Sequence, residues 1–437
     1  MKKQIEDEKL RLIVFKSALE LGESIDRHLL DMYGYDSNDY TFLVPIKENF
    51  FDDGHLKVEI EETVRGKNLF FLTDIGNYSI SYKMRGLINH TSPNDLMMEL
   101  KDGIGACNCH ASNINIIMPL LYAGRQHRRN TRENLMCGAN LRELDNISRI
   151  KSFVTFDAHD QGVEHAVHNM EFDNFYVTTT ILDNFIRDLS LDELRKLVFV
   201  APDNGATGRR NVYLNCFGSP HIHKEAGSFI KQRDYNNFSD GKYPVISHDY
   251  CGNNDLNGKT AIVTDDMISS GGSMFDVIDE LYERGVNHIY LIVTFALFTK
   301  GIDKFQKYVD EGKLDGIYTS NLTYIPEEYK NLPWLHVCDC SHLIANIVYN
   351  LHNDLSISGI LRDKSGPVRL LEKRFNAEKK DWVINPFYLV IVIVIIKVFN
   401  FFIEITNFTC FSIYFNIIFN ISNSKWNFVY FNTIIWI

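Results

Sequence analysis

The stretch from Ala261 to Leu281, AIVTDDMISSGGSMFDVIDEL, narrows most sharply the folds that this chain can adopt. It opens with an apolar run, Ala261 to Val263, of the kind found in strands buried on both faces. Beyond a polar loop, apolar residues recur at helical spacing: Met274, Val277, Ile278 and Leu281. A second apolar run, HIYLIVTF, follows from His288. This order predicts a parallel crossover, with the loop at the carboxyl end of a strand, where α/β sheets bind ligands.

The loop combines two aspartates with small residues. Gly271 and Gly272 permit a tight turn that brings backbone N–H groups close to a ligand, and the helix adds the positive end of its dipole. These donors favour a phosphate. Asp265 and Asp266 suit sugar hydroxyls or a hydrated Mg²⁺. A sugar phosphate satisfies both halves of the loop. The alternative is a tight turn whose serines cap the helix and whose aspartates are solvated.

The remaining sequence repeats this alternation of strands and helices. Further strands are predicted at residues 11–17, 68–74, 113–122, 150–160, 196–206 and 227–235, and helices at 18–35, 94–107 and 132–146. Repeated alternation predicts α/β domains with mostly parallel sheets. Length alone places a boundary near Asp173, because no Pro/Gly/Ser-rich linker marks one. We therefore predict domains at residues 10–173 and 174–361.

The last segment, residues 385–437, differs from the rest of the chain. It contains no Gly, Ala, Asp, Arg, Gln, His or Met, and Phe, Ile and Asn dominate it. Its apolar run from Phe387 to Ile396 stops at Lys397, before the ~18 residues that a spanning helix needs. The segment reads either as a membrane anchor or as translation of AT-rich codons without an evolved fold. We favour the second reading and leave it outside the predicted domains.

The amino-acid composition limits the kinds of ligand that this chain can bind. The formal net charge of −11 argues against nucleic-acid binding and favours small-molecule ligands. Eight cysteines show no CxxC pair and no zinc-ribbon spacing, which is typical of reduced thiols in a cytosol. The first residues, MKKQIEDEKLRLIVF, lack the pattern of a signal peptide. We therefore expect a cytoplasmic protein.

Four more polar stretches follow predicted strands, where ligand-binding residues collect. The stretch YAGRQHRR offers guanidinium groups to a polyphosphate, and FDAHD and APDNG offer carboxylates and a histidine. A fourth, IKQRDY, leads into a polar loop that could close over a reacting phosphate. Taken singly, each could be solvated surface or a hydrogen-bonded turn. The candidate residues are Arg125, Gln126, His159, Asp203, Lys231 and Arg233.

In this order the stretches resemble the motifs of ribose-phosphate pyrophosphokinase, also called phosphoribosyl pyrophosphate (PRPP) synthetase. The family pattern is Tyr-x-x-Arg-Gln-x-Arg, Asp-x-His, Pro-Asp-x-Gly, a Lys-x-Arg loop and the PRPP loop, which TDDMISSGGS matches here. Ser269 and Ser270 replace the common Asp-Thr. The segment FFDDGHLKVEIEETVRGK is similar to the family's Phe-Ser-Asp-Gly-Glu segment, with His55 in place of Glu. The resemblance covers about residues 10 to 361 and points to a longer bacterial-type branch.

The resemblance implies two tandem phosphoribosyltransferase-like (Rossmann-like) domains in a homo-oligomer that shares its active sites. It implies transfer of the pyrophosphoryl group of ATP to the 1-hydroxyl of ribose 5-phosphate, with Mg²⁺. For ribose 5-phosphate, the implied residues are Asp265, Asp266, Ser269, Ser270, Gly271, Gly272 and Ser273. For ATP they are Arg125, Gln126 and His159, with Phe51 and Asp53 facing the adenine bound by a neighbouring subunit. His159 and Asp203 would lie near Mg²⁺, and Lys231 and Arg233 would stabilise the transition state.

Two other functions remain open. A type I phosphoribosyltransferase, which consumes PRPP, would share the PRPP loop but would not need YAGRQHRR or the Lys-x-Arg loop. A non-catalytic regulatory partner would keep the fold and bind nucleotide without turnover, and the departures at His55 and Ser269 are the features that favour it.

Overall fold

The computed structural model describes residues 9–129, 132–233, 245–362 and 365–381. At 231–233, 245–248, 361–362 and 379–381 the description covers the backbone only. Met1–Asn376 form one compact unit and Ala377–Ile437 a second. The tail at 385–437 lies outside the described residues. Within the described ranges, no helix has both the length and the apolar character needed to cross a membrane.

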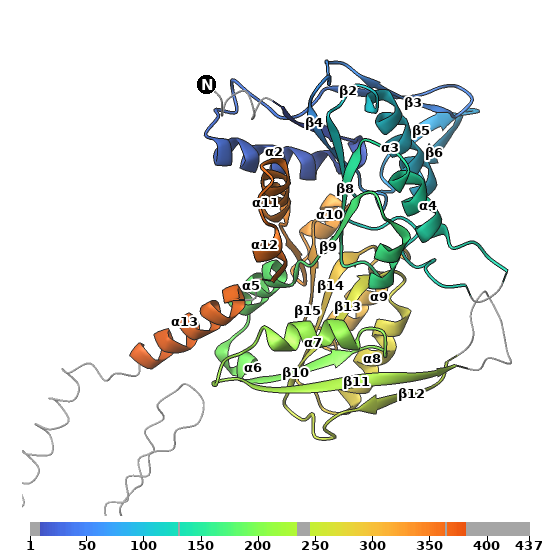
Figure 1. The fold of residues 1–437 in the computed structure, drawn as a ribbon. Helices are drawn as coiled ribbons and strands as arrows, with labels where there is room; N and C mark the ends of the chain where they lie inside the picture. Colours follow the sequence, from blue (N-terminus) through green and yellow to red (C-terminus); the bar gives the residue numbers. More distant parts are fainter. Residues whose placement is uncertain (1–8, 130–131, 234–244, 363–364, 382–437) are drawn as a thin grey trace, which may run out of the picture. The chain divides into compact units, whose positions relative to one another are not determined.

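Five parallel strands form the first sheet, in the order β1-β4-β7-β8-β9 (Figure 1). Their bounds are Leu10–Val14, Asn68–Leu72, Asn113–Ile117, Ile150–Phe156 and Glu171–Phe175. Both faces are buried, because alternate residues of one strand enter different cores: Leu69 and Phe71 on one side, Phe70 and Leu72 on the other. Helices α3 (Pro93–Cys107) and α4 (Met136–Asp145) cover the first side. Helices α2 (Leu19–Tyr33) and α11 (Ser341–His352) pack together on the second.

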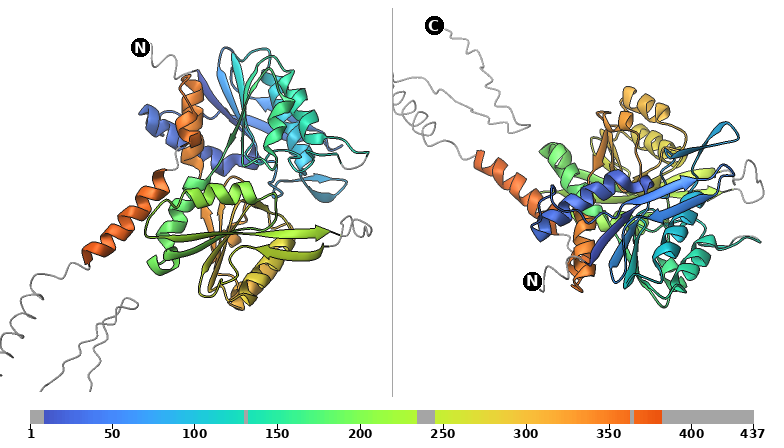
Figure 2. Two further views of the ribbon diagram at one scale, coloured as in Figure 1. Left: turned by 60° about the horizontal axis from the view of Figure 1, so that its bottom comes forward. Right: turned by 90° about the horizontal axis from the view of Figure 1, so that it is seen from above.

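Seven strands form the second sheet, in the order β12-β11-β10-β13-β14-β15-β16. In chain order, β10 to β16 span Lys196–Ala201, His223–Arg233, Val245–Cys251, Thr260–Ile268, His288–Ala296, Gly316–Ser320 and Leu335–Cys338. All neighbouring pairs are parallel except β11 with β12. Helices α8 (Gly272–Glu283) and α9 (Asp303–Asp310) pack on one face, and α5 (Thr178–Asp188) and α7 (Thr207–Asn215) on the other (Figures 1 and 2).

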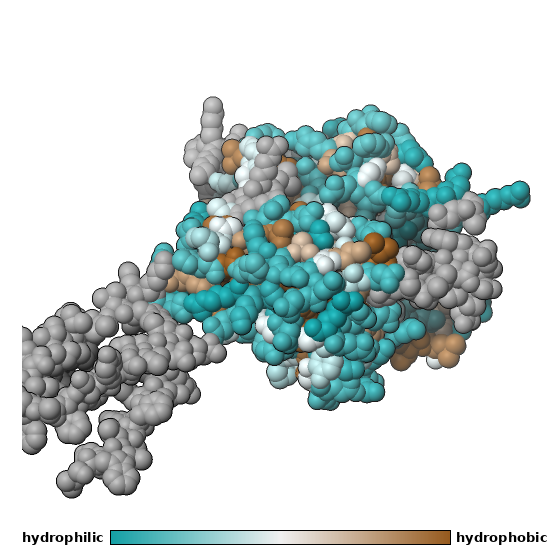
Figure 3. Space-filling model, turned by 90° about the horizontal axis from the view of Figure 1, so that it is seen from below, coloured by the Kyte–Doolittle hydropathy of each residue, from teal (hydrophilic) through white to brown (hydrophobic). Residues whose placement is uncertain are grey.

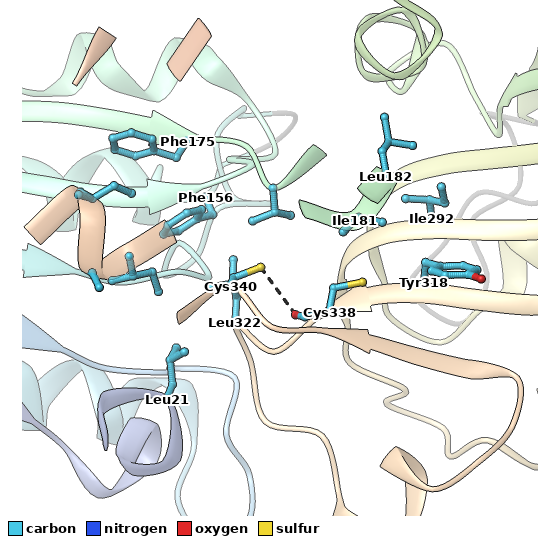
Figure 4. Packing of buried hydrophobic residues seen from close by; sticks show 14 of the residues in the cluster. Leu21, Phe156, Phe175, Ile181, Leu182, Ile292, Tyr318, Leu322, Cys338 and Cys340 are labelled. Carbon is cyan, nitrogen blue, oxygen red and sulfur yellow. Dashed lines mark hydrogen bonds between the residues drawn. The ribbon is translucent and has the colours of Figure 1, made fainter. Parts of the chain in front are cut away.

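One hydrophobic core contains residues of both sheets and joins them. Phe156 and Phe175 of the first sheet lie in the same cluster as Ile292 and Tyr318 of the second, with Leu182 of α5 beside them (Figure 4). All five side chains are almost fully buried. The two sheets are therefore held together by burial of apolar surface, which is the main favourable term in folding. The outer surface seen in Figure 3 is mostly hydrophilic.

Smaller elements complete the first unit. Two antiparallel hairpins, β2 (Ile46–Phe50) with β3 (Leu56–Ile60) and β5 (Ser81–Met84) with β6 (Leu87–His90), contact each other through stacked rings of Phe50 and Tyr82, 4.2 Å apart. The short helices are η1 (Lys16–Ala18), η2 (Gln161–Ala166), α6 (Leu191–Arg195), α10 (Glu327–Lys330) and α12 (Ser358–Arg362). Helix α13 (Ser365–Asp381) follows them.

The predicted fold class, α/β with mostly parallel sheets, is confirmed. Every predicted strand and helix overlaps an observed one, although predicted strands run too long at their polar ends: β7 stops at Ile117, five residues before the predicted end. The hairpins and the strands β9, β12, β15 and β16 were not predicted, since most of them are short and weakly patterned. The predicted boundary near Asp173 falls inside β9, and the division into two domains stays a prediction.

Candidate active site

The carboxyl ends of strands from both sheets meet along one seam. On the first sheet's side the seam contains Asp74, which follows β4, and residues 157–160, which follow β8. On the other side it contains the end of β13, Thr294 of β14, Arg209 of α7 and the loop after β15. Three hydrogen-bonded contacts cross it, centred on the carboxylates of Asp74, Asp157 and Asp266. Polar groups can be buried here because each finds a partner across the seam.

The predicted phosphate loop, residues 269–273, is anchored at its start. The backbone carbonyls of Ile268 and Ser269 accept hydrogen bonds from the N–H groups of Leu297 and Thr299, at 2.8 and 3.0 Å. Gly271 precedes α8 with φ +77°, and its carbonyl accepts the N–H groups of Met274 and Phe275. No side chain of the described residues caps α8. The positive end of its dipole therefore lies at the loop, as an anion site requires.

A glycine is required at position 271 for two reasons. Its positive φ disfavours any residue that carries a Cβ. In addition, a Cβ there would lie 2.5 Å from Cζ of Phe305 and 2.9 Å from Cε2 of Phe275, both buried rings. At Gly272 a Cβ would approach only the hydroxyl of Ser270, at 3.9 Å. The first glycine therefore shapes the turn, and the second leaves the backbone open to a ligand.

The paired aspartates at the end of β13 have different environments. Asp266 is 3% exposed, and its carboxylate accepts hydrogen bonds from Nδ1 of His159 at 2.6 Å and from the N–H of Met267 at 2.9 Å. Asp265 is half-buried and accepts the N–H of Asp266. Burial, followed by the charge of Asp266, raises the pKa of Asp265 to about 8. Burial works in the same direction on Asp266, but the His159 hydrogen bond and the Arg209 charge lower its pKa.

The hydrogen bond to Asp266 affects both the pKa and the tautomer of His159. It raises the pKa of His159, against the opposing effect of burial. In the neutral ring it holds the proton on Nδ1, so that Nε2 is the nitrogen available to a metal or a phosphate. A carboxylate in this position is the usual orienting partner of a metal-binding histidine.

Arg209 is a site residue that the sequence analysis missed. Its Nη2 lies 2.7 Å from Oδ1 of Asp157, its Nε lies 3.0 Å from each Asp157 oxygen, and its Nη1 lies 3.5 Å from Oδ1 of Asp265. The side chain is 13% exposed. Asp157 raises the pKa of Arg209 despite its burial, so this cation stays charged. The signal available was its place four residues after APDNG, in the first turn of the helix that follows this strand end.

Three of the predicted ATP residues, Arg125, Gln126 and His159, lie on the first sheet's side of the seam. Arg125 and Gln126 are exposed in the turn after β7, where the N–H of Gln126 bonds to the carbonyl of Ala123 at 2.7 Å. The charge of Arg125 opposes protonation of His159, although the hydrogen bond to Asp266 keeps the pKa of His159 raised. The next residue, His127, has its ring 5.3 Å from that of His159. Two imidazole rings therefore lie together next to Asp266.

The remaining predicted site residues lie in three separate parts of the fold. Phe51 is 53% exposed in the turn between β2 and β3, where Asp53 bonds to His55. Asp203 precedes α7 and accepts the N–H of Ala206 at 3.2 Å, and its charge acts on Asp265. Lys231 and Arg233 lie on β11, opposite β12. Their side chains, and residues 234–244, are outside the described residues, so the catalytic role of Lys231 and Arg233 stays a prediction.

A magnesium ion fits the donors near the seam only in part. Among the described residues, no three His, Cys, Asp or Glu side chains are grouped to hold a metal ion. Mg²⁺ usually takes one or two protein carboxylates and completes its shell with water and substrate phosphates. The carboxylate of Asp203 is compatible with that pattern, whereas the imidazole of His159 is a less usual ligand for so hard a cation.

Comparisons with known proteins agree with this picture. Residues 10–146 match the family model of the N-terminal domain of ribose phosphate pyrophosphokinase, and residues 249–362 match that of the phosphoribosyl synthetase-associated domain. The ribose-phosphate pyrophosphokinase of Nostoc sp. is 25% identical over 362 residues, which cover 82% of this chain and 95% of the relative. That of Synechococcus elongatus is 25% identical over 361 residues, covering 82% and 95%.

A solved structure shows the same fold. The phosphoribosylpyrophosphate synthetase from Mycobacterium smegmatis superposes with a TM-score of 0.60 and 20% identity, over 79% of this chain and 99% of that one. Because the two family domains match in order along one chain, and relatives of one name cover most of it, this chain belongs to the ribose-phosphate pyrophosphokinase family.

Proposed function

We propose that this chain transfers the pyrophosphoryl group of ATP to the 1-hydroxyl of ribose 5-phosphate, giving PRPP and AMP for nucleotide synthesis. The observation that carries the proposal is the 2.6 Å contact of His159, on the first sheet's side, with Asp266, beside the glycine-serine loop of the second. This contact supports the proposal because it joins the proposed ATP-side group to the proposed pentose-phosphate site. The relatives named above support the substrates.

The pentose would bind at the carboxyl end of β13. Residues 269–273 would hold the 5-phosphate through backbone N–H groups and the dipole of α8. Asp265 and Asp266 would hold the ribose hydroxyls. Since both oxygens of Asp266 already accept hydrogen bonds, direct contact with the sugar falls mainly to Asp265, while Asp266 orients His159.

ATP would bind from the first sheet's side, gripped by Arg125, Gln126 and His159. Phe51 and Asp53 would contact the adenine bound by a neighbouring copy, which makes the active form at least a dimer. Asp203 and His159 would hold Mg²⁺, whose charge would neutralise phosphate oxygens when it is bound. We also propose a cytoplasmic location.

The reaction requires alignment more than covalent chemistry by the protein. The 1-hydroxyl attacks the β-phosphorus of ATP in line, and AMP leaves. The residues of the seam would fix the two reactants in that line, which removes much of the entropic barrier. Lys231 and Arg233 would stabilise the negative charge that develops on the transferred group.

The test uses the full-length protein with Mg²⁺, ATP and ribose 5-phosphate, with AMP and PRPP measured together. Equal amounts of both are expected. Asp265→Asn should lower kcat/KM for ribose 5-phosphate at least about tenfold. The matched control is Asp276→Asn, the same change at an exposed position on α8.

Two results would point to the other functions. Nucleotide binding without AMP formation would indicate a non-catalytic regulatory partner. Consumption of PRPP with a supplied nucleobase, without activity in the first assay, would indicate a phosphoribosyltransferase.

A further inference from the structure

The guanidinium of Arg209 connects the two sheets at the point where the pentose is proposed to bind. One edge of the group is paired with Asp157, which follows β8, and the other reaches Asp265 on β13. No other cation of the described residues is recorded in an ion pair with either aspartate. The Asp157–Arg209–Asp265 chain is therefore a direct polar link between the two halves of the site.

Asp157 is held firmly enough to orient its partner. It is 3% exposed, its carboxylate accepts the hydroxyl of Thr294 at 2.7 Å, and its N–H donates to the carbonyl of Phe175 at 2.8 Å. Its φ of +43° is uncommon for a residue other than glycine and persists only where the surroundings impose it. The Asp157 carboxylate therefore fixes both the position and the plane of the Arg209 guanidinium, because the pairing uses two of its nitrogens.

We infer that Arg209 is a positioning residue that sets the orientation of the Asp265 carboxylate for the pentose. The inference rests on the proposed function, since it takes Asp265 as a ribose contact. Arg209 and the N–H of Asp266 both contact Oδ1 of Asp265, at 3.5 and 2.9 Å, which leaves Oδ2 of that carboxylate to the sugar. Asp157 acts through Arg209, so the pentose grip of the second sheet depends on a residue of the first.

A double-mutant cycle tests this chain of contacts. Arg209→Gln, Asp157→Asn and the double variant are assayed for kcat and for the KM of each substrate. Each single change should raise KM for ribose 5-phosphate about tenfold or more, as expected when a binding group is misplaced by a fraction of an ångström. For Arg209→Gln, KM for ATP should stay within about threefold of the wild-type value. The double variant should be no worse than the worse single variant, because both remove the same link.

Conservative variants show whether Arg209 acts by orienting Asp265 or only by its positive charge. Arg209→Lys keeps the positive charge but cannot form the two-nitrogen pair, so it should remain impaired. Full rescue by lysine would overturn the inference, and so would additive effects of the two single changes. Arg284→Lys, at the residue that ends α8 and pairs with Glu280, is the control and should behave as wild type. If Arg209→Gln does not fold, Arg209→Lys carries the test, since it retains the buried charge.

Asp265→Asn distinguishes a failure of the positioning role of Arg209 from a failure of the proposed function. If it raises KM for ribose 5-phosphate while Arg209→Gln does not, the positioning role is excluded and the proposed function stands. If Asp265→Asn leaves the use of ribose 5-phosphate unchanged, the proposed ribose site itself is wrong.

Discussion

The two adjacent glycines of the phosphate loop allow a paired test of the turn. Gly271→Ala places a methyl group in a backbone conformation that costs an L-residue about 1–2 kcal/mol. The methyl also overlaps Phe305 at 2.5 Å and Phe275 at 2.9 Å. These rings cannot easily move aside, because both are at most 3% exposed and pack on each other with centroids 4.6 Å apart. Forcing extra volume into a packed core costs about 1–3 kcal/mol more.

We therefore expect Gly271→Ala to lower the free energy of unfolding by about 3 kcal/mol. Gly272→Ala should leave it unchanged or raise it by up to ~1 kcal/mol, because this residue is the first of α8 and alanine favours a helix. The measurement is urea unfolding of both variants and the wild type, followed by circular dichroism. The denaturation midpoint should fall for Gly271→Ala alone, with little change in slope.

The same two variants distinguish an effect on the stability of the fold from an effect on ribose 5-phosphate binding. A methyl group at position 272 faces the open side of the loop, so Gly272→Ala should weaken ribose 5-phosphate binding without destabilising the fold. If the two variants unfold within ~0.5 kcal/mol of each other, the packing argument for Gly271 is wrong, since surface substitutions differ by about that much.

Three further predictions concern charged residues. Lys231→Ala should lower kcat by on the order of a thousandfold while changing KM far less, as kinetics with both substrates would show. Glu99 of α3 is buried, and burial, aided by the charge of Glu48, raises its pKa to about 8. As pH rises from about 4.5 to 8, the unfolded chain releases this proton while the folded protein retains it, so stability falls. Glu99→Gln should remove that loss and raise the free energy of unfolding at pH 8.5 by about 2–4 kcal/mol, with little effect near pH 4.5. Arg209→Ala should cost about 3–5 kcal/mol in thermal or urea unfolding, because it leaves Asp157 buried without its cation.

The first two of these predictions have a matched control, and each of the three has a result that contradicts it. Lys224→Ala changes a lysine on the same strand as Lys231 and should leave kcat unaltered; an unaltered kcat in Lys231→Ala would exclude the catalytic role. Glu23→Gln changes an exposed glutamate on α2 and should be neutral at every pH. Equal stability gains at pH 4.5 and 8.5 for Glu99→Gln would show that ionisation is not the cause. A melting temperature unchanged by Arg209→Ala would mean that the buried ion pair contributes nothing to stability.

Local sequence patterns determined many of the strands and helices of this protein and the glycine-rich turn of its main loop. Apolar runs and helical spacing identify a strand or helix from one segment alone, because each depends on which side chains one element can bury. The turn at Gly271 is local in its positive φ, which calls for glycine, whereas the close approach of the Phe305 ring comes from α9. Polar residues after strands could likewise be assigned to one edge of a sheet before their partners were known.

Only the tertiary structure decided which of those polar residues meet. His159 and Asp266 are 107 positions apart and Arg209 and Asp157 are 52 apart, so no local spacing relates them. Their pairing depends on the strand order within each sheet and on the packing of the two sheets through a shared core. The pKa differences between Asp265 and Asp266 arise in the same way, because burial and neighbouring charge exist only once that core has formed.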